Sequence, residues 1–206
     1  MREKILHSSL LMFMKFGIRS VSMDDLSEQL GISKKTLYQY FSDKNSLVLE
    51  ATRTYFDNER CIGLEIVNTN PNPIDQLLLL YNHILKQVAG FNPNLIYDLL
   101  KYHIAAWDEL KGYRDHFIRE NTFQNLQNGI DQGYYRQDIH IEIVTGLYLN
   151  LALGVINQDT FPIEKYSLSQ VYLQLIELYL RGICTPKGVK YFEQNHRLLG
   201  KNETTN

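Results

Sequence analysis

The sequence has few of the features that mark secreted or metal-binding proteins. Its only two cysteines, Cys61 and Cys184, lie far apart and share no metal-ligand spacing. This excludes a disulfide framework and favours a reducing compartment. The six histidines are scattered rather than grouped with cysteines or carboxylates. We therefore expect no metal site and no cofactor.

Long apolar runs are also missing. The most apolar stretch, IVTGLYLNLALGVI at 143–156, has fourteen residues and is too short to cross a bilayer. The opening run MREKILHSSLLMFMKFG begins like a signal peptide, but His7, Ser8 and Ser9 interrupt it and no small-x-small cleavage site is present. The expectation is a cytoplasmic protein without a membrane partner.

Sequence motifs of enzymes are equally scarce. The chain contains no nucleophile elbow, zinc-protease motif, phosphate loop or dinucleotide fingerprint. Asp98, His103, Asp108 and Cys61 carry reactive groups, but their spacing places them in no recognisable catalytic arrangement. An enzyme is thus a minor alternative, and no catalytic residue is expected.

The charge is small and unevenly distributed. A net charge of −2 gives the whole chain no attraction for nucleic acid. Residues 1–48, however, hold seven Lys and Arg against five Asp and Glu, whereas the remainder holds fourteen against eighteen. A modestly basic end on an acidic body is consistent with a local anion-binding site.

Apolar residues recur at spacings of three and four, which predicts an all-α protein. A first helix ends near Gly17, a residue suited to a left-handed terminal position. Three further helices are expected at 23–30, 34–41 and about 44–61. Ser22 with Asp25 forms a capping box before the second, Ser33 precedes the third, and Ser42 with Asp43 precedes the fourth. Gly31 ends the second helix, so the pattern is that of a helix-turn-helix.

Further helices follow in the rest of the chain. The predicted ranges are about 73–89, 95–107, 113–132, 138–156 and 167–182, with Pro73 at a first helical position and Asp138 and Ser167 as caps. We expect a helix-turn-helix DNA-binding domain at 1–48 and a helical effector-binding and dimerisation domain at 49–206. The helix at about 44–61 would connect the two.

The third helix has the composition of a DNA-reading helix. Leu37 and Phe41 face inward, which leaves its polar residues on the surface. Lys35, Thr36 and Gln39 are candidates for base edges, since lysine suits guanine and glutamine suits adenine. The hydroxyls of Ser22 and Ser33 and the tyrosines suit phosphates. An ordinary solvated basic face, with Tyr38 packed on the first helix, is the alternative. The expected DNA-binding residues are Ser22, Ser33, Lys34, Lys35, Thr36, Tyr38, Gln39, Tyr40 and Lys44.

The stretch SVSMDDLSEQLGISKKTLYQYFSDKNSLV resembles the amino-terminal domain of the tetracycline-repressor (TetR/AcrR-type) family of bacterial transcriptional regulators. The shared features are the hydroxyl that opens the second helix, the Gly-apolar-Ser turn, the run from Leu37 to Phe41, and Lys44. The resemblance covers about residues 1–50. It differs at Lys35, where the family frequently has glycine. The resemblance implies a two-fold dimer that is built as a four-helix bundle.

Two late helices are apolar on all sides, which is typical of helices buried on both sides. The segment 143–156 has one row of large residues that includes Leu147 and Leu151, and an opposite row of Gly146, Asn150 and Gly154. The segment 171–183 is similarly apolar. These last two long helices predict a homodimer interface. A position at the centre of one large core is the alternative.

The middle of the chain is rich in aromatic residues, as enclosed small-molecule pockets are. The candidate effector-binding residues are Tyr81, Tyr102, His103, Trp107, Phe117 and Phe123. Any helical core uses such residues too. We expect a repressor that a small hydrophobic or aromatic effector releases from a palindromic operator. The alternative is a DNA-binding dimer without an effector, either constitutive or controlled by a protein partner.

Overall fold

The computed structural model describes residues 1–88, 92, 94–157, 159–162 and 164–195. Its regular structure is helical, with one isolated β-bridge between Tyr135 and Cys184, so the predicted all-α class is confirmed. The chain divides into two compact units. Unit 1 is Met1–Cys61 with Gly90–Tyr113, and unit 2 is Ile62–Ala89 with Arg114–Asn206. The functional division into 1–48 and 49–206 stays a prediction.

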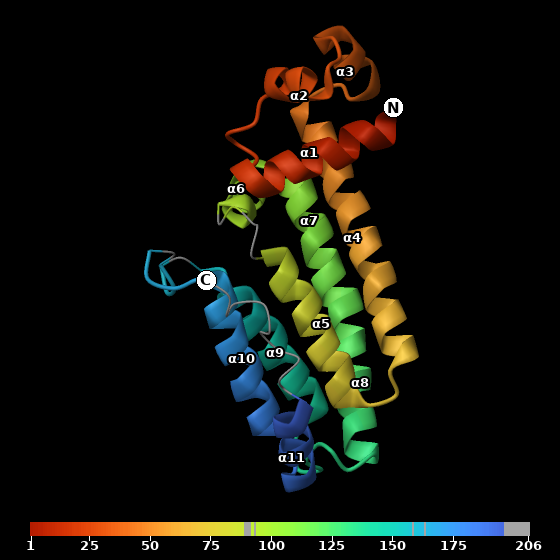
Figure 1. Cartoon of the computed structure of the whole chain (residues 1–206), viewed down its shortest axis with the longest axis vertical. Helices are drawn as coiled ribbons and strands as arrows, with labels where there is room; N and C mark the ends of the chain where they lie inside the picture. Colours follow the sequence, from red (N-terminus) through yellow and green to blue (C-terminus); the bar gives the residue numbers. More distant parts are fainter. Residues whose placement is uncertain (89–91, 93, 158, 163, 196–206) are drawn as a thin grey trace. The chain divides into compact units, whose positions relative to one another are not determined.

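Unit 1 contains the helix-turn-helix and packs it around one apolar core (Figure 1). Its helices are α1 (Arg2–Phe16), α2 (Met23–Leu30), α3 (Lys34–Tyr40), the first part of α4 (Lys44–Thr69), α6 (Leu95–Tyr102) and α7 (Ile104–Gly112). The core joins one leucine each from α2, α3 and α4 with residues of α1, α6 and α7; these are Leu26, Leu37, Leu47, Ile5, Leu99 and Ala106.

Side-chain caps define the short helices of unit 1. The Ser22 hydroxyl accepts a hydrogen bond from the Asp25 amide at 3.1 Å, and the Asp25 carboxylate accepts one from the Ser22 amide at 2.7 Å. The Ser33 hydroxyl accepts from the Thr36 amide at 3.0 Å. Both predicted caps are therefore confirmed, and they satisfy amides that a helix start leaves without partners.

Glycines with positive φ end the first two helices. Gly31 has φ 64° and ψ 33°, the left-handed conformation expected after α2. Gly17 has φ 83° but ψ 151°, so it turns the chain after α1 without adopting the left-handed helical conformation that the sequence predicted. Its amide still donates to the Phe13 carbonyl at 2.9 Å.

The helix that begins at Lys44 is longer than predicted. It ends at Thr69 rather than near Cys61. No proline lies between Cys61 and Thr69. The first prolines after Cys61 belong to the Asn-Pro-Asn-Pro run at 70–73, and the helix ends just before this run. There the Asn70 side chain donates to the Ile66 carbonyl at 2.8 Å and closes the last turn.

The helices after residue 94 also begin and end differently from the prediction. The expected helix at 95–107 is interrupted at His103, which has φ −132° and ψ 61°. The expected break before Tyr113 is absent, because α7 continues through a π-helix (Tyr113–Ile118) into α8 (Arg119–Asp131). No proline or glycine marks the position of His103, and buried residues on both sides of it pack into the same core.

Unit 2 is a helical bundle. It contains α5 (Pro73–Val88), α8, α9 (Ile141–Gly154), α10 (Leu168–Ile183) and α11 (Pro186–Asn195) (Figure 1). Pro73 opens α5 as predicted; the predicted last residue, Ala89, lies outside the described residues. Helix α11 was not predicted. Within the described part of the chain, no helix combines the length and apolar character needed to cross a membrane.

The two predicted caps in unit 2 have different outcomes. Ser167 and Gln170 form a capping box at the start of α10, as predicted. Asp138 does not cap α9, which begins three residues later without a side-chain cap. Its carboxylate instead pairs with Arg136, at 2.9 Å from both Nε and Nη2. A nearby guanidinium thus competes successfully with the helix amides for this carboxylate.

Candidate nucleic-acid interface

Helix α3 presents one buried and one exposed side. Leu37 is fully buried and Phe41, which follows the helix, is 2% exposed. Tyr38 and Tyr40 are 46% and 40% exposed. Tyr38 therefore reaches the surface, and its role in DNA binding stays a prediction. The exposed face consists of Lys34, Lys35, Tyr38, Gln39 and Tyr40, with Thr36 half-buried.

The polar residues of α3 differ in their partners. The Lys34 ammonium lies 2.5 Å from an Asp24 carboxylate oxygen on α2, in an exposed ion pair. Lys35 and Gln39 are exposed and form no hydrogen bond or ion pair with the residues that the structure describes. Their hydrogen-bonding groups are therefore available to a ligand of this face, whereas Lys34 first has to leave Asp24.

The three predicted hydroxyl contacts already have internal partners. The Ser33 and Thr36 hydroxyl oxygens lie 2.8 Å apart. The Ser22 hydroxyl donates to the Asp25 carboxylate at 2.6 Å. The hydrogen bonds from Ser22 lower the pKa of Asp25, and the charge of Lys44 adds to this effect. Ser22 thus stands beside a fixed negative charge and reaches a phosphate only by opening the capping box.

Lys44 is held inside unit 1 rather than extended from its surface. Its ammonium donates to the Ile18 carbonyl at 2.6 Å. Burial lowers the pKa of Lys44, while the carboxylates of Asp98 and Asp25 partly oppose that shift. Lys44 therefore stabilises the loop between α1 and α2. Its contact with a DNA phosphate stays a prediction.

Asp98 also contacts the loop between α1 and α2. This α6 residue is 5% exposed, and its carboxylate accepts a hydrogen bond from the Arg19 amide at 2.9 Å. The sequence did not identify it as a partner of the helix-turn-helix, because 79 positions separate the two residues. Only the fold brings α6 to the loop that leads into α2.

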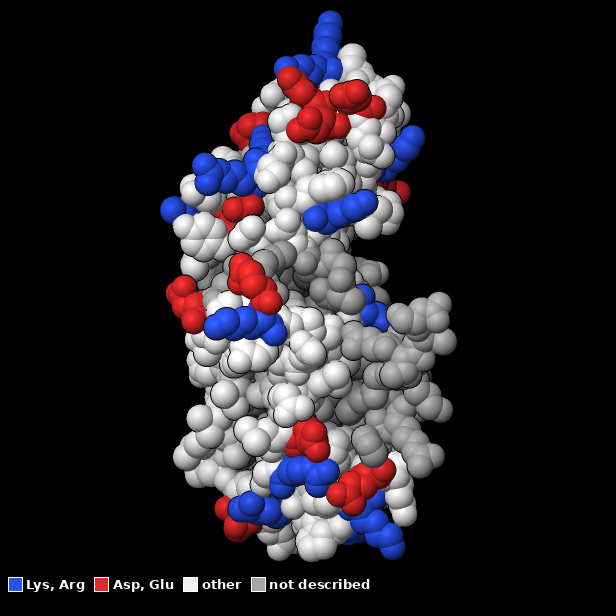
Figure 2. Space-filling model, turned by 60° about the vertical axis from the view of Figure 1, so that its left-hand side comes forward, with Lys and Arg blue, Asp and Glu red and all other residues white. Residues whose placement is uncertain are grey.

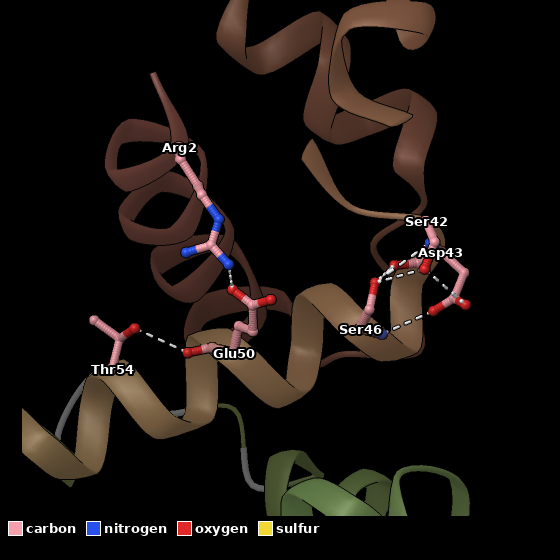
Figure 3. A network of polar contacts seen from close by, with 6 residues as sticks. All are labelled: Arg2, Ser42, Asp43, Ser46, Glu50 and Thr54. Carbon is pink, nitrogen blue, oxygen red and sulfur yellow. Dashed lines mark hydrogen bonds and ion pairs between the residues drawn. The ribbon is translucent and has the colours of Figure 1, made fainter. Parts of the chain in front are cut away.

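A polar network fixes the start of α4 (Figure 3). The Asp43 carboxylate accepts from the Ser46 amide at 2.7 Å, so the predicted cap by Asp43 is confirmed, and this bond lowers the pKa of Asp43. Ser42 donates to Asp43 at 3.4 Å rather than capping the helix itself. One turn further along α4, Glu50 pairs with Arg2 of α1. These contacts fix the start of α4 to the short segment that follows α3 and to α1.

The helix-turn-helix is not uniformly basic. Figure 2 shows Lys and Arg side chains interspersed with Asp and Glu at the end formed by α2 and α3. Asp24 and Asp25 belong to the first turn of α2, which explains part of this mixture. Recognition by this surface therefore depends on individual side chains rather than on a broad positive field.

The six predicted effector residues are divided between the units. Tyr102, His103 and Trp107 belong to unit 1, and Tyr81, Phe117 and Phe123 belong to unit 2. Tyr102 is 42% exposed, with the Arg19 guanidinium 5.5 Å from its ring centre. Burial and the charge of Lys44 lower the pKa of His103, against the opposing effect of Asp98. In the part of the chain described, no three metal-binding side chains form a group.

Comparison with known proteins agrees with this geometry. Residues 5–51 match the family model described as bacterial regulatory proteins, tetR family. The chain is 26% identical over 190 residues to YvaF of Bacillus subtilis, an HTH-type transcriptional regulator, covering 89% of this chain and 95% of YvaF. It is 24% identical over 193 residues to the repressor KstR2 of Mycobacterium tuberculosis, covering 91% and 94% of the two chains.

A solved structure extends the similarity to the whole fold. A transcriptional regulator from Saccharomonospora viridis, crystallised with choline, superimposes with a TM-score of 0.71 at 16% identity, covering 89% of this chain and 97% of the other. The matched family consists of DNA-binding regulators rather than enzymes. The amino-terminal match and the full-length similarity to distant regulators agree: this chain belongs to the TetR family of helix-turn-helix transcriptional regulators.

Proposed function

We propose that the protein is a repressor that binds a palindromic operator as a homodimer and leaves it when a small, mainly apolar molecule binds. The main support for DNA recognition is the exposed face of α3. On this face Lys35 and Gln39 form no hydrogen bond or ion pair with the described residues. Lysine suits guanine and glutamine suits adenine in the major groove.

A homodimer is supported by an exposed apolar face on α9 and α10. On α9, Ile143, Leu147 and Leu151 are 57%, 57% and 48% exposed, and on α10 Leu178 is 73% exposed. Gly154 lies seven residues after Leu147, so it shares this side of α9 rather than the opposite row that the sequence indicated, and no atom lies within 4 Å of the position its Cβ would take. Large apolar residues at helical spacing that remain exposed mark interaction surfaces. The alternative position of α9 at the centre of one core does not fit these exposures.

Similar proteins support control by a ligand. KstR2 is named a repressor, and the Saccharomonospora viridis regulator was crystallised with choline. In the proposed dimer, a ligand changes the distance between the two copies of α3 only if it binds one dimer conformation more tightly than the other. Specificity and control then both depend on the dimer, since a single short helix contacts few base pairs.

Selection of bound duplexes from a random DNA library tests this proposal. The expected product is a palindrome whose half-sites lie one or more helical turns apart. Binding is expected to weaken steeply with salt, because phosphate contacts release counterions. Recovery of asymmetric sites, or of no enriched sequence, would contradict it. We place this activity in the cytoplasm, where bacterial DNA lies.

A further inference from the structure

Four tyrosines in the core of unit 2 bring their phenol groups together. Tyr81 of α5, Tyr148 of α9, and Tyr172 and Tyr179 of α10 are 1%, 7%, 7% and 8% exposed. The ring centres of Tyr81 and Tyr172 lie 5.9 Å apart, and those of Tyr148 and Tyr179 lie 4.8 Å apart. All four rings belong to the same core of unit 2, and the Tyr148 hydroxyl lies beside those of Tyr81 and Tyr172, so the four groups form one cluster.

Several polar atoms of this tyrosine cluster and its surroundings lack partners. The hydroxyls of Tyr81 and Tyr179 are buried and form no hydrogen bond of normal geometry with the described residues. Thr145 is 1% exposed and lies about one turn before Tyr148 on α9, and its hydroxyl also forms no hydrogen bond with the described residues. Unsatisfied hydroxyls in a core cost free energy, so their presence calls for a physical reason.

A neighbouring tyrosine shows how this core satisfies a hydroxyl that serves only the fold. Tyr135 is fully buried, and its hydroxyl donates to the Asn125 side-chain oxygen at 3.1 Å. Asn125 donates in turn to Gln76 at 2.9 Å and to the Pro73 carbonyl at 2.8 Å. This network is closed. The hydroxyls of Tyr81 and Tyr179, in the same core, remain without such partners.

The buried interior of unit 2, to which the cluster belongs, favours an uncharged ligand. The buried polar residues that the structure describes in unit 2 are Gln76, Thr122, Asn125, Thr145 and Ser169. None of these side chains carries a charge. A charged ligand would lose its hydration here without gaining a counter-charge, whereas a neutral ligand needs only hydrogen bonds and apolar contact.

We propose that the tyrosine cluster, with Thr145, is the polar part of the effector site, and that the effector is an uncharged, mainly apolar molecule bearing hydroxyl or carbonyl groups. This inference rests on the proposed ligand-controlled repressor and names the ligand class and the residues. Of the six residues expected from the sequence, only Tyr81 belongs to the cluster. The ligand groups accept from and donate to the hydroxyls of Tyr81, Tyr179 and Thr145.

The same helices connect the cluster to the proposed dimer surface. Tyr148 lies beside the exposed Leu147 on α9, and Tyr179 follows the exposed Leu178 on α10. The four rings are buried, so a ligand enters by displacing at least one of them. Such a displacement favours a different placement of α9 or α10 and thereby selects one dimer geometry over another.

The probe for the test is 4-hydroxyacetophenone, an uncharged aromatic ring with one hydroxyl and one carbonyl group. Its Kd for the full-length protein is measured by ligand-observed NMR titration, together with Tm in its absence. Tyr81→Phe and Tyr179→Phe should each raise the Kd by about 3- to 10-fold, the effect of losing one neutral hydrogen bond. Tyr179→Phe should keep the wild-type Tm, because the Tyr179 hydroxyl has no partner among the described residues. Tyr81→Phe should lower Tm less than loss of the Tyr135 hydroxyl does, because the Tyr81 hydroxyl has the Tyr148 hydroxyl beside it but no hydrogen bond of normal geometry.

Tyr135→Phe is the matched control. It should lower Tm, because Asn125 loses its donor, and leave the Kd of the probe unchanged. Benzoate and benzyltrimethylammonium, which are similar in size but charged, should bind at least tenfold more weakly than the neutral probe.

Any one of the following results would overturn the inference. One is an unchanged Kd in both Tyr81→Phe and Tyr179→Phe, or no binding of the neutral probe at millimolar concentration. Another is a fall in Tm of these variants as large as that of Tyr135→Phe, which would show that the hydroxyls serve the fold. The third is equal binding of the charged probes. If the wild-type protein still selects a palindrome, only the ligand site is refuted; failure to bind DNA refutes the proposed function instead.

Discussion

At the scale of single residues, neighbours of the same type have different roles. Lys34 and Lys35 are adjacent in the sequence, yet the ammonium of Lys34 is paired with Asp24 while Lys35 is exposed without such a partner. Lys44, whose contact with a DNA phosphate stays a prediction, donates a hydrogen bond to the Ile18 carbonyl. Residue type therefore determines which interactions a side chain can form. Its partners in the folded chain determine whether it is free to form them with a ligand.

Gln39→Ala should relax the preference for one base position of each half-site. The expected cost at that position is about 1–3 kcal/mol, with little change at other positions. Selection of duplexes by the variant measures this directly. Gln29→Ala, which removes an exposed glutamine from α2, is the control and should leave the selected sequence unchanged. An unaltered preference in Gln39→Ala would show that this residue does not read a base.

His103 should make the stability of the protein depend on pH. Its pKa in the folded chain is lowered by burial and by Lys44, and its Nδ1 is buried without a partner. Below about pH 6.5, the ordinary pKa of histidine, the unfolded chain binds a proton that the folded chain resists. Stability should therefore be fully present above that pH and fall as the pH decreases.

Measurement of Tm between about pH 7.5 and 5.5, where most carboxylates keep their charge, checks this expectation. His103→Gln should show a shallower fall than the wild type. His140→Gln, whose side chain is 62% exposed, is the control and should follow the wild-type curve. Identical slopes in all three proteins would contradict the assignment.

At the scale of elements, the loop between α1 and α2 is held from two directions. Lys44 at the start of α4 binds the carbonyl of residue 18, and Asp98 of α6 binds the amide of residue 19. Because this loop leads into α2 and the turn before α3, these two contacts help to set the orientation of the reading helix. Helix α6 thus acts on the helix-turn-helix through a buried polar contact as well as through the apolar core.

Asp98→Ala should destabilise the protein by about 1–3 kcal/mol, because the Arg19 amide loses its acceptor and Lys44 loses a nearby negative charge. Asp98→Asn keeps an acceptor oxygen and should lose less. Urea denaturation gives the free energy of unfolding, and DNA titration gives the effect on affinity. Asp108→Ala, at an exposed α7 position, should change neither quantity. A loss of equal size at Asp108 would refute a specific role for Asp98.

At the scale of the whole molecule, the apolar face of α9 and α10 is the surface that we propose for assembly. Its residues remain 48–73% exposed in a single chain, although the opposite side of both helices is buried in unit 2. Association of two copies through this face would remove it from water, which favours the dimer. Two reading helices joined in this way bind one operator much better than two separate chains.

Leu147→Glu should therefore convert the dimer to monomers. A carboxylate buried in an apolar interface should raise the dimer Kd at least about 30-fold, which corresponds to about 2 kcal/mol. Size-exclusion chromatography with light scattering measures the change, and operator affinity should fall with it. Leu64→Glu replaces a leucine that is 42% exposed on α4 and should leave the dimer intact. A variant of Leu147 that stays dimeric would exclude this face as the interface.

The sequence by itself determined the helix-turn-helix, because the signals for it are local. Capping residues, a glycine with positive φ and apolar residues one turn apart act within a few positions of each other, so Ser22, Gly31, Ser33 and Leu37 could be interpreted without a structure. The face of α3 that points outward followed from the same periodicity.

Only the tertiary structure decided the rest, because those features arise from contacts between distant residues. The pairing of Asp98 with the Arg19 amide, the interruption at His103 and the convergence of four tyrosines from three helices leave no local pattern. Likewise, a tyrosine looks the same in a sequence whether its hydroxyl has a hydrogen-bond partner, as in Tyr135, or none among the described residues, as in Tyr179. Which of these applies depends on the neighbours that folding brings to it.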